Sequence, residues 1–185
     1  MRMEPRVAAI VRLMRVLDRS EADTGVGIAE RRAAAARLSH LGAGLVMPRG
    51  PEPASTDDIL VPVDGGRITV RLYRPHGPGP HPMYVFLHGG GWCIGTIEER
   101  DARCRAISAG ASCTVASVDY RMAPENQYPT APEDCYAALC WLVEHADEVG
   151  IDATRVASPG CTRQATVGAK PLCRDHRERF GKPQV

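Results

Sequence analysis

Residues 83–96 of this 185-residue chain read MYVFLHGGGWCIGT, a short apolar run followed at once by three successive glycines. Such a run is typical of a strand that is buried on both faces of a sheet. Glycines carry no Cβ, so they let the backbone turn sharply and approach a ligand closely. This stretch therefore predicts a buried strand over Met83–Leu87 that ends in a tight turn.

The segments around this stretch alternate between strand and helix patterns. Before it, Ile59–Val63 and Arg67–Tyr73 have a period of two and are joined across Asp64-Gly65-Gly66, which predicts a hairpin. After it, the patterns predict a helix, a buried strand, a long amphipathic helix and the start of another strand, over residues 98–110, 113–118, 131–149 and 154–157. A hairpin followed by this alternation predicts an α/β fold with a mostly parallel sheet, antiparallel at its N-terminal edge.

Two of these segments allow finer predictions. The apolar stripe of the long helix is expected to consist of Tyr136, Leu139, Cys140 and Leu142. The first ~46 residues predict two helices, which could form a lid, a membrane-facing flap or simply a packing layer, with packing as the default. We therefore expect two parts: cap helices and a linker over 1–50, and an α/β core over 51–185 that is incomplete at its C-terminus.

Composition narrows the functions that this chain can have. The formal net charge is +1, and nucleic-acid binding needs a strong basic excess, so no nucleic-acid partner is expected. No apolar run is long enough to form a transmembrane segment. The seven cysteines form no C-x-x-C pair, which predicts reduced thiols in a cytoplasmic protein with no metal and no cofactor.

The glycine-rich turn is suited to one kind of chemistry. Acyl transfer passes through a tetrahedral intermediate whose oxygen carries negative charge, and two or three backbone N–H groups aimed at one point stabilise it. An HGGG loop directly after a buried strand supplies such donors. His88, Gly89, Gly90 and Gly91 are therefore the predicted oxyanion-hole residues.

Two stretches together resemble a known family. HGGGWCIGT (88–96) and SVDYRMAPENQYPTAPEDCYAALCWL (117–142) are similar to the hormone-sensitive-lipase family of carboxylesterases. The resemblance implies an α/β-hydrolase fold, ester hydrolysis, and N–H groups of Gly90 and Gly91 that point at the oxyanion. It also implies that His88 holds the loop and does not transfer protons. Structural support is implied for Trp92, Asp119, Tyr120, Arg121 and Glu125.

The pattern fails where the family requires G-x-S-x-G, with the nucleophilic serine on a strand-to-helix elbow. Thr162 stands at the serine position, Gly160 at the first glycine and Gln164 at the second. None of the serines lies in such a motif, and Pro159 disturbs the strand. A threonine or cysteine needs a positioned base to act, so neither Thr162 nor Cys161 is expected to work as a nucleophile. The downstream acid and histidine of the family are also missing, so we expect an inactive or weakly active chain.

Three interpretations stay open. The chain is an esterase-family protein that is truncated or damaged near Thr162, and a local frameshift would account for the damage, because the bases of Thr-Arg-Gln-Ala can encode Ser-Ala-Gly in another frame. Alternatively, it is a non-catalytic module that binds a carboxylate through the same N–H groups. The third is a product that does not fold stably. The expected partner is a small-molecule ester or carboxylate ligand, and homo-oligomer formation is left open.

Overall fold

The computed structural model describes residues 27–28, 30–34 and 51–158. They contain five strands: β1 (Ser55–Val63), β2 (Gly66–Arg74), β3 (His81–Leu87), β4 (Thr114–Asp119) and β5 (Ile151–Ala157). The helices of residues 51–158 are α3 (Ile97–Ala111), α4 (Thr130–Glu144) and the short α5 (Ala146–Val149). Ile28 and residues 30–34 are also helical. Each predicted strand and helix after residue 51 is confirmed in type and order.

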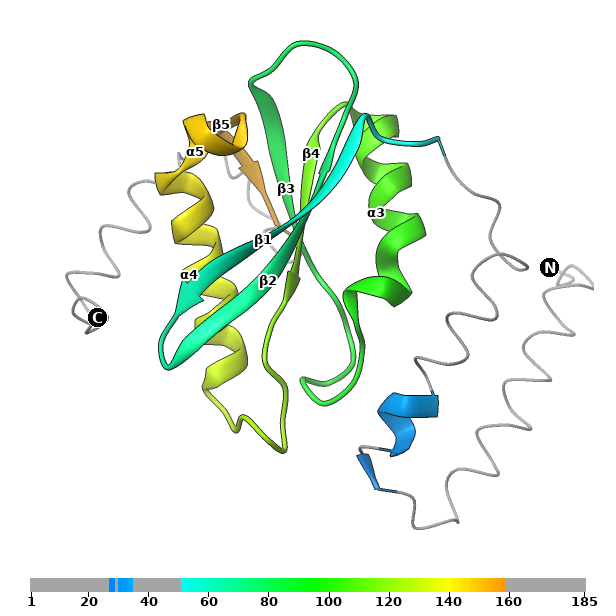
Figure 1. Ribbon diagram of the computed structural model, residues 1–185, viewed down its shortest axis with the longest axis vertical. Helices are drawn as coiled ribbons and strands as arrows, with labels where there is room; N and C mark the ends of the chain where they lie inside the picture. The colour runs from blue at the N-terminus through cyan, green and yellow to red at the C-terminus, as the bar shows by residue number, and fades with distance from the viewer. Residues whose placement is uncertain (1–26, 29, 35–50, 159–185) are drawn as a thin grey trace, which may run out of the picture.

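The five described strands form one sheet in the order β1-β2-β4-β3-β5 (Figure 1). β1 pairs antiparallel with β2 across the turn Asp64-Gly65, and β2 pairs antiparallel with β4. β3 pairs parallel with both β4 and β5. β2 is therefore the single reversed strand among those described, and the predicted α/β sheet with its antiparallel N-terminal edge is confirmed.

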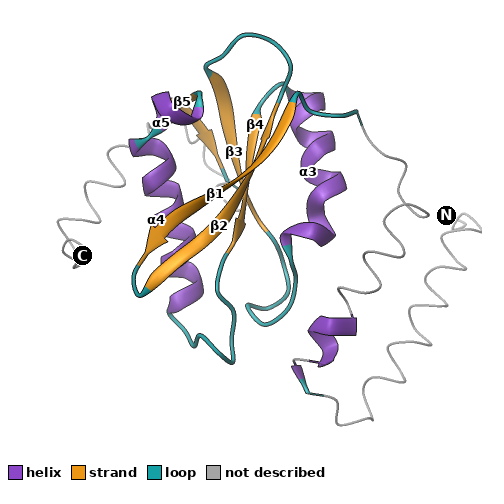
Figure 2. Ribbon diagram, viewed as in Figure 1, coloured by secondary structure: helices purple, strands orange, loops and turns teal. Residues whose placement is uncertain are grey.

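Helices cover both faces of this sheet, with α3 on one side and α4 and α5 on the other (Figure 2). Side chains alternate between the two faces along each strand. On β4, Val115 packs toward Cys104 of α3, whereas Ala116 and Val118 join the larger core under α4. The larger core takes most of its strand residues from β2, β3 and β4, including Val70, Leu72, Met83 and Val85, which are at most 2% exposed.

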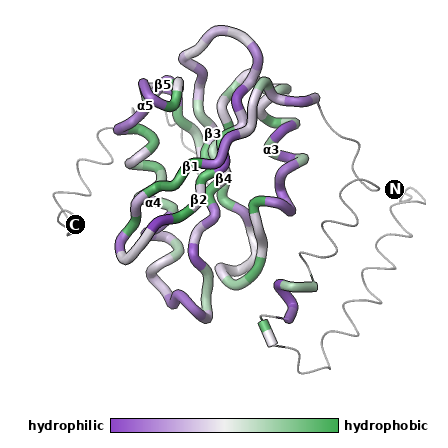
Figure 3. The backbone as a smooth tube through the Cα atoms, in the orientation of Figure 1, coloured by the Kyte–Doolittle hydropathy of each residue, from purple (hydrophilic) through white to green (hydrophobic). Residues whose placement is uncertain are grey.

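The two main helices differ in how their sequences hold them in place. α4 is mainly hydrophobic, whereas α3 is mainly hydrophilic (Figure 3). α3 begins with a side-chain cap, because the Thr96 hydroxyl accepts a hydrogen bond from the N–H of Glu99 at 3.2 Å. Arg105 of α3 also pairs with Asp101 and with Glu52, so polar contacts add to the small apolar cluster beneath this helix.

The structure corrects three details of the sequence analysis. The helix predicted over Ala131–Val149 is interrupted at His145, so that α4 and α5 are separate helices. The last strand begins at Ile151, before the predicted Thr154, because Gly150 ends α5 in the left-handed conformation. The buried face of α4 is also shifted from the predicted stripe, of which only Leu142 is fully buried. The residues of α4 that are buried are Ala131, Asp134, Cys135, Ala138, Leu142 and Val143.

Several predictions fall outside the described residues. Most of the two N-terminal helices and everything after Ser158, including Thr162, lie there. The division of the chain at residue 50 stays a prediction. Among the helices of the described residues, none is sufficiently long and apolar to span a bilayer.

Candidate active site

The segment that follows β3 folds into a tight turn closed by backbone hydrogen bonds. The N–H groups of Cys93 and Ile94 both donate to the carbonyl of Gly90, at 3.1 Å. Gly90 has a φ of 142°, and a Cβ at this position would lie 1.8 Å from the carbonyl oxygen of Ile94. No side chain fits in that space. The second glycine of the run is therefore required by geometry.

Gly95, which the sequence analysis did not single out, is needed for a similar reason. Its φ is 110°, and an added Cβ would lie 2.5 Å from Nδ1 of His88 and 2.7 Å from the carbonyl oxygen of Gly89. Trp92 also takes a positive φ, of 64°, which is strained for a residue with a side chain. Its ring packs edge-on against Tyr120, with 5.2 Å between the ring centroids.

The turn leaves its glycine N–H groups available. No described residue accepts a hydrogen bond from the N–H of Gly90 or of Gly91. Gly91 is exposed and Gly90 is half-buried. We refer to residues 88–96 as the glycine loop.

His88 anchors the start of the glycine loop and is 4% exposed. The Tyr120 hydroxyl donates to the His88 carbonyl at 2.5 Å and lies 3.1 Å from its Nδ1, while the two rings stack at 4.2 Å. Nδ1 also lies 3.2 Å from the carbonyl oxygen of Gly89. Because that carbonyl only accepts, the contact favours the neutral tautomer with its proton on Nδ1.

Burial controls ionisation at this anchor. Loss of hydration lowers the pKa of His88, so the imidazole is neutral at pH 7. Burial likewise raises the pKa of Tyr120 to about 12, and its hydroxyl keeps its proton. Both rings therefore act as neutral hydrogen-bonding groups. Asp119, at the end of β4, has a pKa raised by burial and by the nearby Glu98.

Arg121 connects three elements beneath the loops. Its Nε and backbone N–H donate to one carboxylate oxygen of Asp134 at 2.9 and 3.0 Å, and its Nη2 donates to the other at 2.6 Å. Nη2 also donates to the carbonyl of Asp64 in the hairpin turn, at 2.8 Å. Asp134, on α4, is 1% exposed. Arg121, in the segment after β4, therefore fixes this segment to α4 through the buried Asp134 and to the hairpin turn through Asp64.

The segment after β4, residues 120–126, lies against the glycine loop. The N–H of Ala123 donates to the carbonyl of Trp92 at 2.9 Å. Arg32, from the helical residues 30–34, reaches both segments: it donates to the carbonyls of Cys93 and Ala123 and pairs with Glu125. The side chain of Arg32 is 22% exposed, and that of Glu125 is 55% exposed.

Two open surface hollows adjoin these segments. One, of about 360 Å³, is mostly polar and is lined by Arg32, Arg67, Asp119, Tyr120, Arg121 and Glu125, among others. The other, of about 260 Å³, is mostly apolar and lies between Trp92, Leu87 of β3, the α4 residues Cys135 and Leu139, and Ser158. The glycine loop therefore has an apolar hollow on the side where β5 ends.

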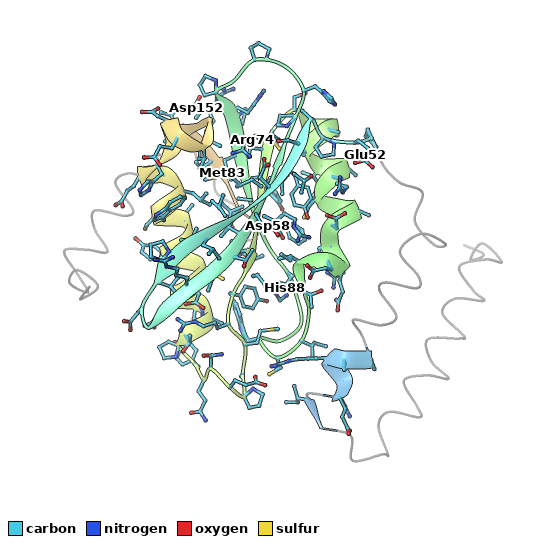
Figure 4. All side chains as sticks on the ribbon, viewed as in Figure 1. Glu52, Asp58, Arg74, Met83, His88 and Asp152 are labelled. Atoms are coloured by element: carbon cyan, nitrogen blue, oxygen red, sulfur yellow. The ribbon has the colours of Figure 1, made fainter. Side chains whose placement is uncertain are left out.

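The structure brings most of the predicted site residues together. Tyr120 links His88 to Trp92, and Arg121 and Glu125 hold the neighbouring segment. Figure 4 places His88 at the end of the sheet far from Asp152, the end at which β3 and β5 both terminate. Thr162 and Cys161 lie outside the described residues. Among residues 51–158 and the described part of 27–34, no group of three His, Cys, Asp or Glu side chains could hold a metal ion.

Sequence reasoning missed three residues of this arrangement. Arg32 acts through contacts with residues 61 and 91 positions away, and no local pattern marks it. Asp134 pairs with Arg121, 13 positions before it, and lies within the quoted stretch 117–142, but its burial is not visible in the sequence. Gly95 could have been found from its sequence position, because it lies in the same HGGGWCIGT stretch.

Comparison with protein families matches residues 84–162 to the family described as alpha/beta hydrolase fold. Among curated relatives, the carboxylic ester hydrolase LipN of Mycobacterium tuberculosis is 41% identical over 140 residues, which cover 74% of this chain and 37% of LipN. An arylesterase of Saccharolobus solfataricus is 35% identical over 133 residues, covering 71% of this chain and 43% of the relative. The chain thus spans about two fifths of the length of these relatives.

The solved structures that resemble this chain include proteins that are also named as ester hydrolases or carboxylesterases. The ester hydrolase EH1AB1 from the metagenome of Lake Arreo superposes with a TM-score of 0.76 at 29% identity, over 98% of this chain and 57% of that protein. The carboxylesterase EstE1, cloned from a metagenomic library, gives a TM-score of 0.69 at 36% identity, over 83% of this chain and 52% of that protein.

Proposed function

Because this chain belongs to the α/β-hydrolase fold family, together with carboxylic ester hydrolases, we propose that its glycine loop is the oxyanion hole of an ester-hydrolysing site. The observation that carries the proposal is the turn at Gly90. The turn excludes a side chain at Gly90, and the N–H groups of Gly90 and Gly91 have no acceptor among the described residues. Donors held in this way cost no reorganisation when charge develops on a carbonyl oxygen.

The remaining predicted site residues support this loop. His88 and Tyr120 are neutral and mutually bonded, so they hold the loop without placing a charge beside it. A charged imidazolium would also stabilise an anion, but burial disfavours that state. The open apolar hollow beside Trp92 offers a place for the alkyl part of an ester, and a small-molecule ester is the proposed partner.

We propose that the chain itself hydrolyses esters only at a trace rate. The sequence has Thr162 where the family has its serine, Gln164 in place of a glycine, and no G-x-S-x-G elsewhere in the chain. The family match itself ends at Thr162. An oxyanion hole without its triad retains roughly 10³–10⁴-fold catalysis over water in serine proteases, which sets the scale for a residual rate.

The test is the initial rate of p-nitrophenyl butyrate hydrolysis by the chain and by Gly90→Ala. The added methyl group cannot fit against Ile94, so the N–H groups must move and the residual rate should fall to that of buffer. Gly110→Ala is the matched control, because a Cβ added at this exposed glycine of α3 would meet no atom within 4 Å. Thr162→Ala and Cys161→Ala should leave the rate unchanged. Substantial turnover that either of these two variants abolishes would overturn the proposal of a trace rate.

The second candidate function is binding of a carboxylate without turnover. It is favoured by the same unpartnered N–H groups, which attract anions generally, in a chain that lacks the motif serine. Calorimetric titration with butyrate distinguishes the two functions. Saturable binding that Gly90→Ala removes, with no hydrolysis above buffer, would favour the binding module.

A further inference from the structure

Arg32 makes contacts that the proposed function does not yet use. Its Nε donates to the carbonyl of Cys93 at 2.6 Å, its Nη2 donates to the carbonyl of Ala123, and its Nη1 pairs with Glu125 at 2.8 Å. The first acceptor lies 61 residues away in the sequence and the second 91 residues away. One side chain from the N-terminal helical residues thus holds two separate loops.

The carbonyl of Cys93 belongs to the turn that shapes the glycine loop. The N–H of the same residue donates to Gly90, so Cys93 is held on both sides, by Gly90 and by Arg32. The loop has one further described backbone contact with the 120–126 segment, from the N–H of Ala123 to the carbonyl of Trp92. Arg32 bonds the carbonyl of Ala123, which closes a ring of contacts through both loops.

A guanidinium suits this role because its donors form a rigid planar fork. The two carbonyl contacts use Nε and Nη2, and the ion pair with Glu125 uses Nη1. An ammonium group on a flexible stem could retain the ion pair but could not reproduce the fork. Arg32→Lys therefore separates the effect of the positive charge from the effect of the hydrogen bonds to the two carbonyls.

We propose that Arg32, from the helical residues 30–34, is a positioning residue for the glycine loop. By fixing the carbonyls of Cys93 and Ala123, it holds the turn at Gly90 and so the direction of the Gly90 and Gly91 N–H groups. Without it, two partly buried carbonyls lose a charged donor and the turn relaxes. This inference rests on the proposed function in so far as those N–H groups are the oxyanion donors.

The first test follows Trp92 and needs no ester turnover. Trp92 and Trp141 are the two tryptophans of the chain, so Trp141→Phe leaves Trp92 as the single emitter. In that background, Arg32→Ala should raise acrylamide quenching of Trp92, and Arg32→Lys should do the same. Ethylguanidinium should reverse the change in Arg32→Ala, whereas ethylammonium at equal concentration should not. Arg74→Ala, which removes a surface ion pair with Asp57, is the matched control and should leave quenching unchanged.

The second test compares hydrolysis of p-nitrophenyl butyrate. Arg32→Ala should lower kcat by about 10- to 100-fold with little change in KM, because small misplacements of positioned groups have effects of this size. If Arg32 only stabilised the fold, Arg32→Ala would hydrolyse the ester at the wild-type rate once that rate is divided by the fraction of folded molecules. Far-UV circular dichroism establishes the folded fraction, and if Arg32→Ala does not fold, Arg32→Lys carries both tests.

Unchanged Trp92 quenching in Arg32→Ala would overturn the proposal. Wild-type quenching in Arg32→Lys would also overturn it, since the ion pair alone would then suffice. Failure of the proposed function is a separate result: neither hydrolysis nor butyrate binding would depend on Gly90. In that case, increased quenching of Trp92 in the Arg32 variants would still support Arg32 as the residue that holds the glycine loop. The link between Arg32 and oxyanion chemistry would be overturned.

Discussion

Replacement of Asp134 by alanine should destabilise the fold more than any change at a surface carboxylate. Asp134 is 1% exposed and accepts three hydrogen bonds from Arg121, at 2.6, 2.9 and 3.0 Å. Asp134→Ala leaves the Arg121 guanidinium with one hydrogen-bond acceptor among the described residues, the carbonyl of Asp64, in a site where its charge was neutralised. A partner lost from a buried ion pair costs more than the pair contributed, because the remaining charge stays desolvated.

The expected loss follows from the exposure of the two partners. Removing one member of a fully buried pair costs about 3–5 kcal/mol. The Arg121 side chain is 27% exposed and can rehydrate in part, so we expect about 2–3 kcal/mol for Asp134→Ala. With an m-value of roughly 2 kcal/mol/M, that lowers the urea midpoint by roughly 1–1.5 M.

Urea unfolding followed by far-UV circular dichroism measures this loss. Asp57→Ala is the matched control, because it removes a carboxylate that is 53% exposed and pairs with Arg74, and it should cost under about 1 kcal/mol. The double variant Arg121→Met with Asp134→Leu removes both charges and should be more stable than Asp134→Ala alone. A loss at Asp134 no larger than that at Asp57, or a chain without a cooperative transition, would refute the reasoning.

Two further predictions concern ionisation. A hydrogen bond from Arg71 lowers the pKa of Asp58 below its ordinary value of 3.8. The ionised Asp58 carboxylate therefore stabilises the fold above this ordinary value, and the stabilisation is lost as the pH falls through the folded-state pKa. Wild type and Asp58→Asn should therefore differ by under about 1 kcal/mol at pH 7 and converge as the pH falls through the folded-state pKa, and a difference that grows on acidification would contradict this sign. Burial raises the pKa of Cys104 to about 11 and that of Cys135 to about 12. Among the five cysteines of the described residues, mapped alkylation at pH 8 should modify the half-buried Cys93 and Cys140 first, and early labelling of Cys104 or Cys135 would show that the core opens.

The sequence by itself determined where the strands and helices lie, their order along the chain, and the position of the glycine loop. These features depend on residues that are near one another in the chain. The Asp64-Gly65-Gly66 turn predicts the hairpin, and the runs over Met83–Leu87 and 113–118 predict strands buried on both faces. The requirement for glycine at Gly90 is local too, because the clash is with Ile94 four residues later.

The tertiary structure decided which side chains those elements bury. A hydrophobic stripe could not identify the inner face of α4, because that face contains Asp134, which is buried only since Arg121 arrives from the segment after β4. Arg32 likewise gains its partners from carbonyls 61 and 91 residues away. Main-chain carbonyls carry no sequence signal, and the cost of burying a charge depends on partners that only the fold brings close. Local patterns therefore locate the candidate site, whereas the contacts that hold its loop exist only in the folded chain.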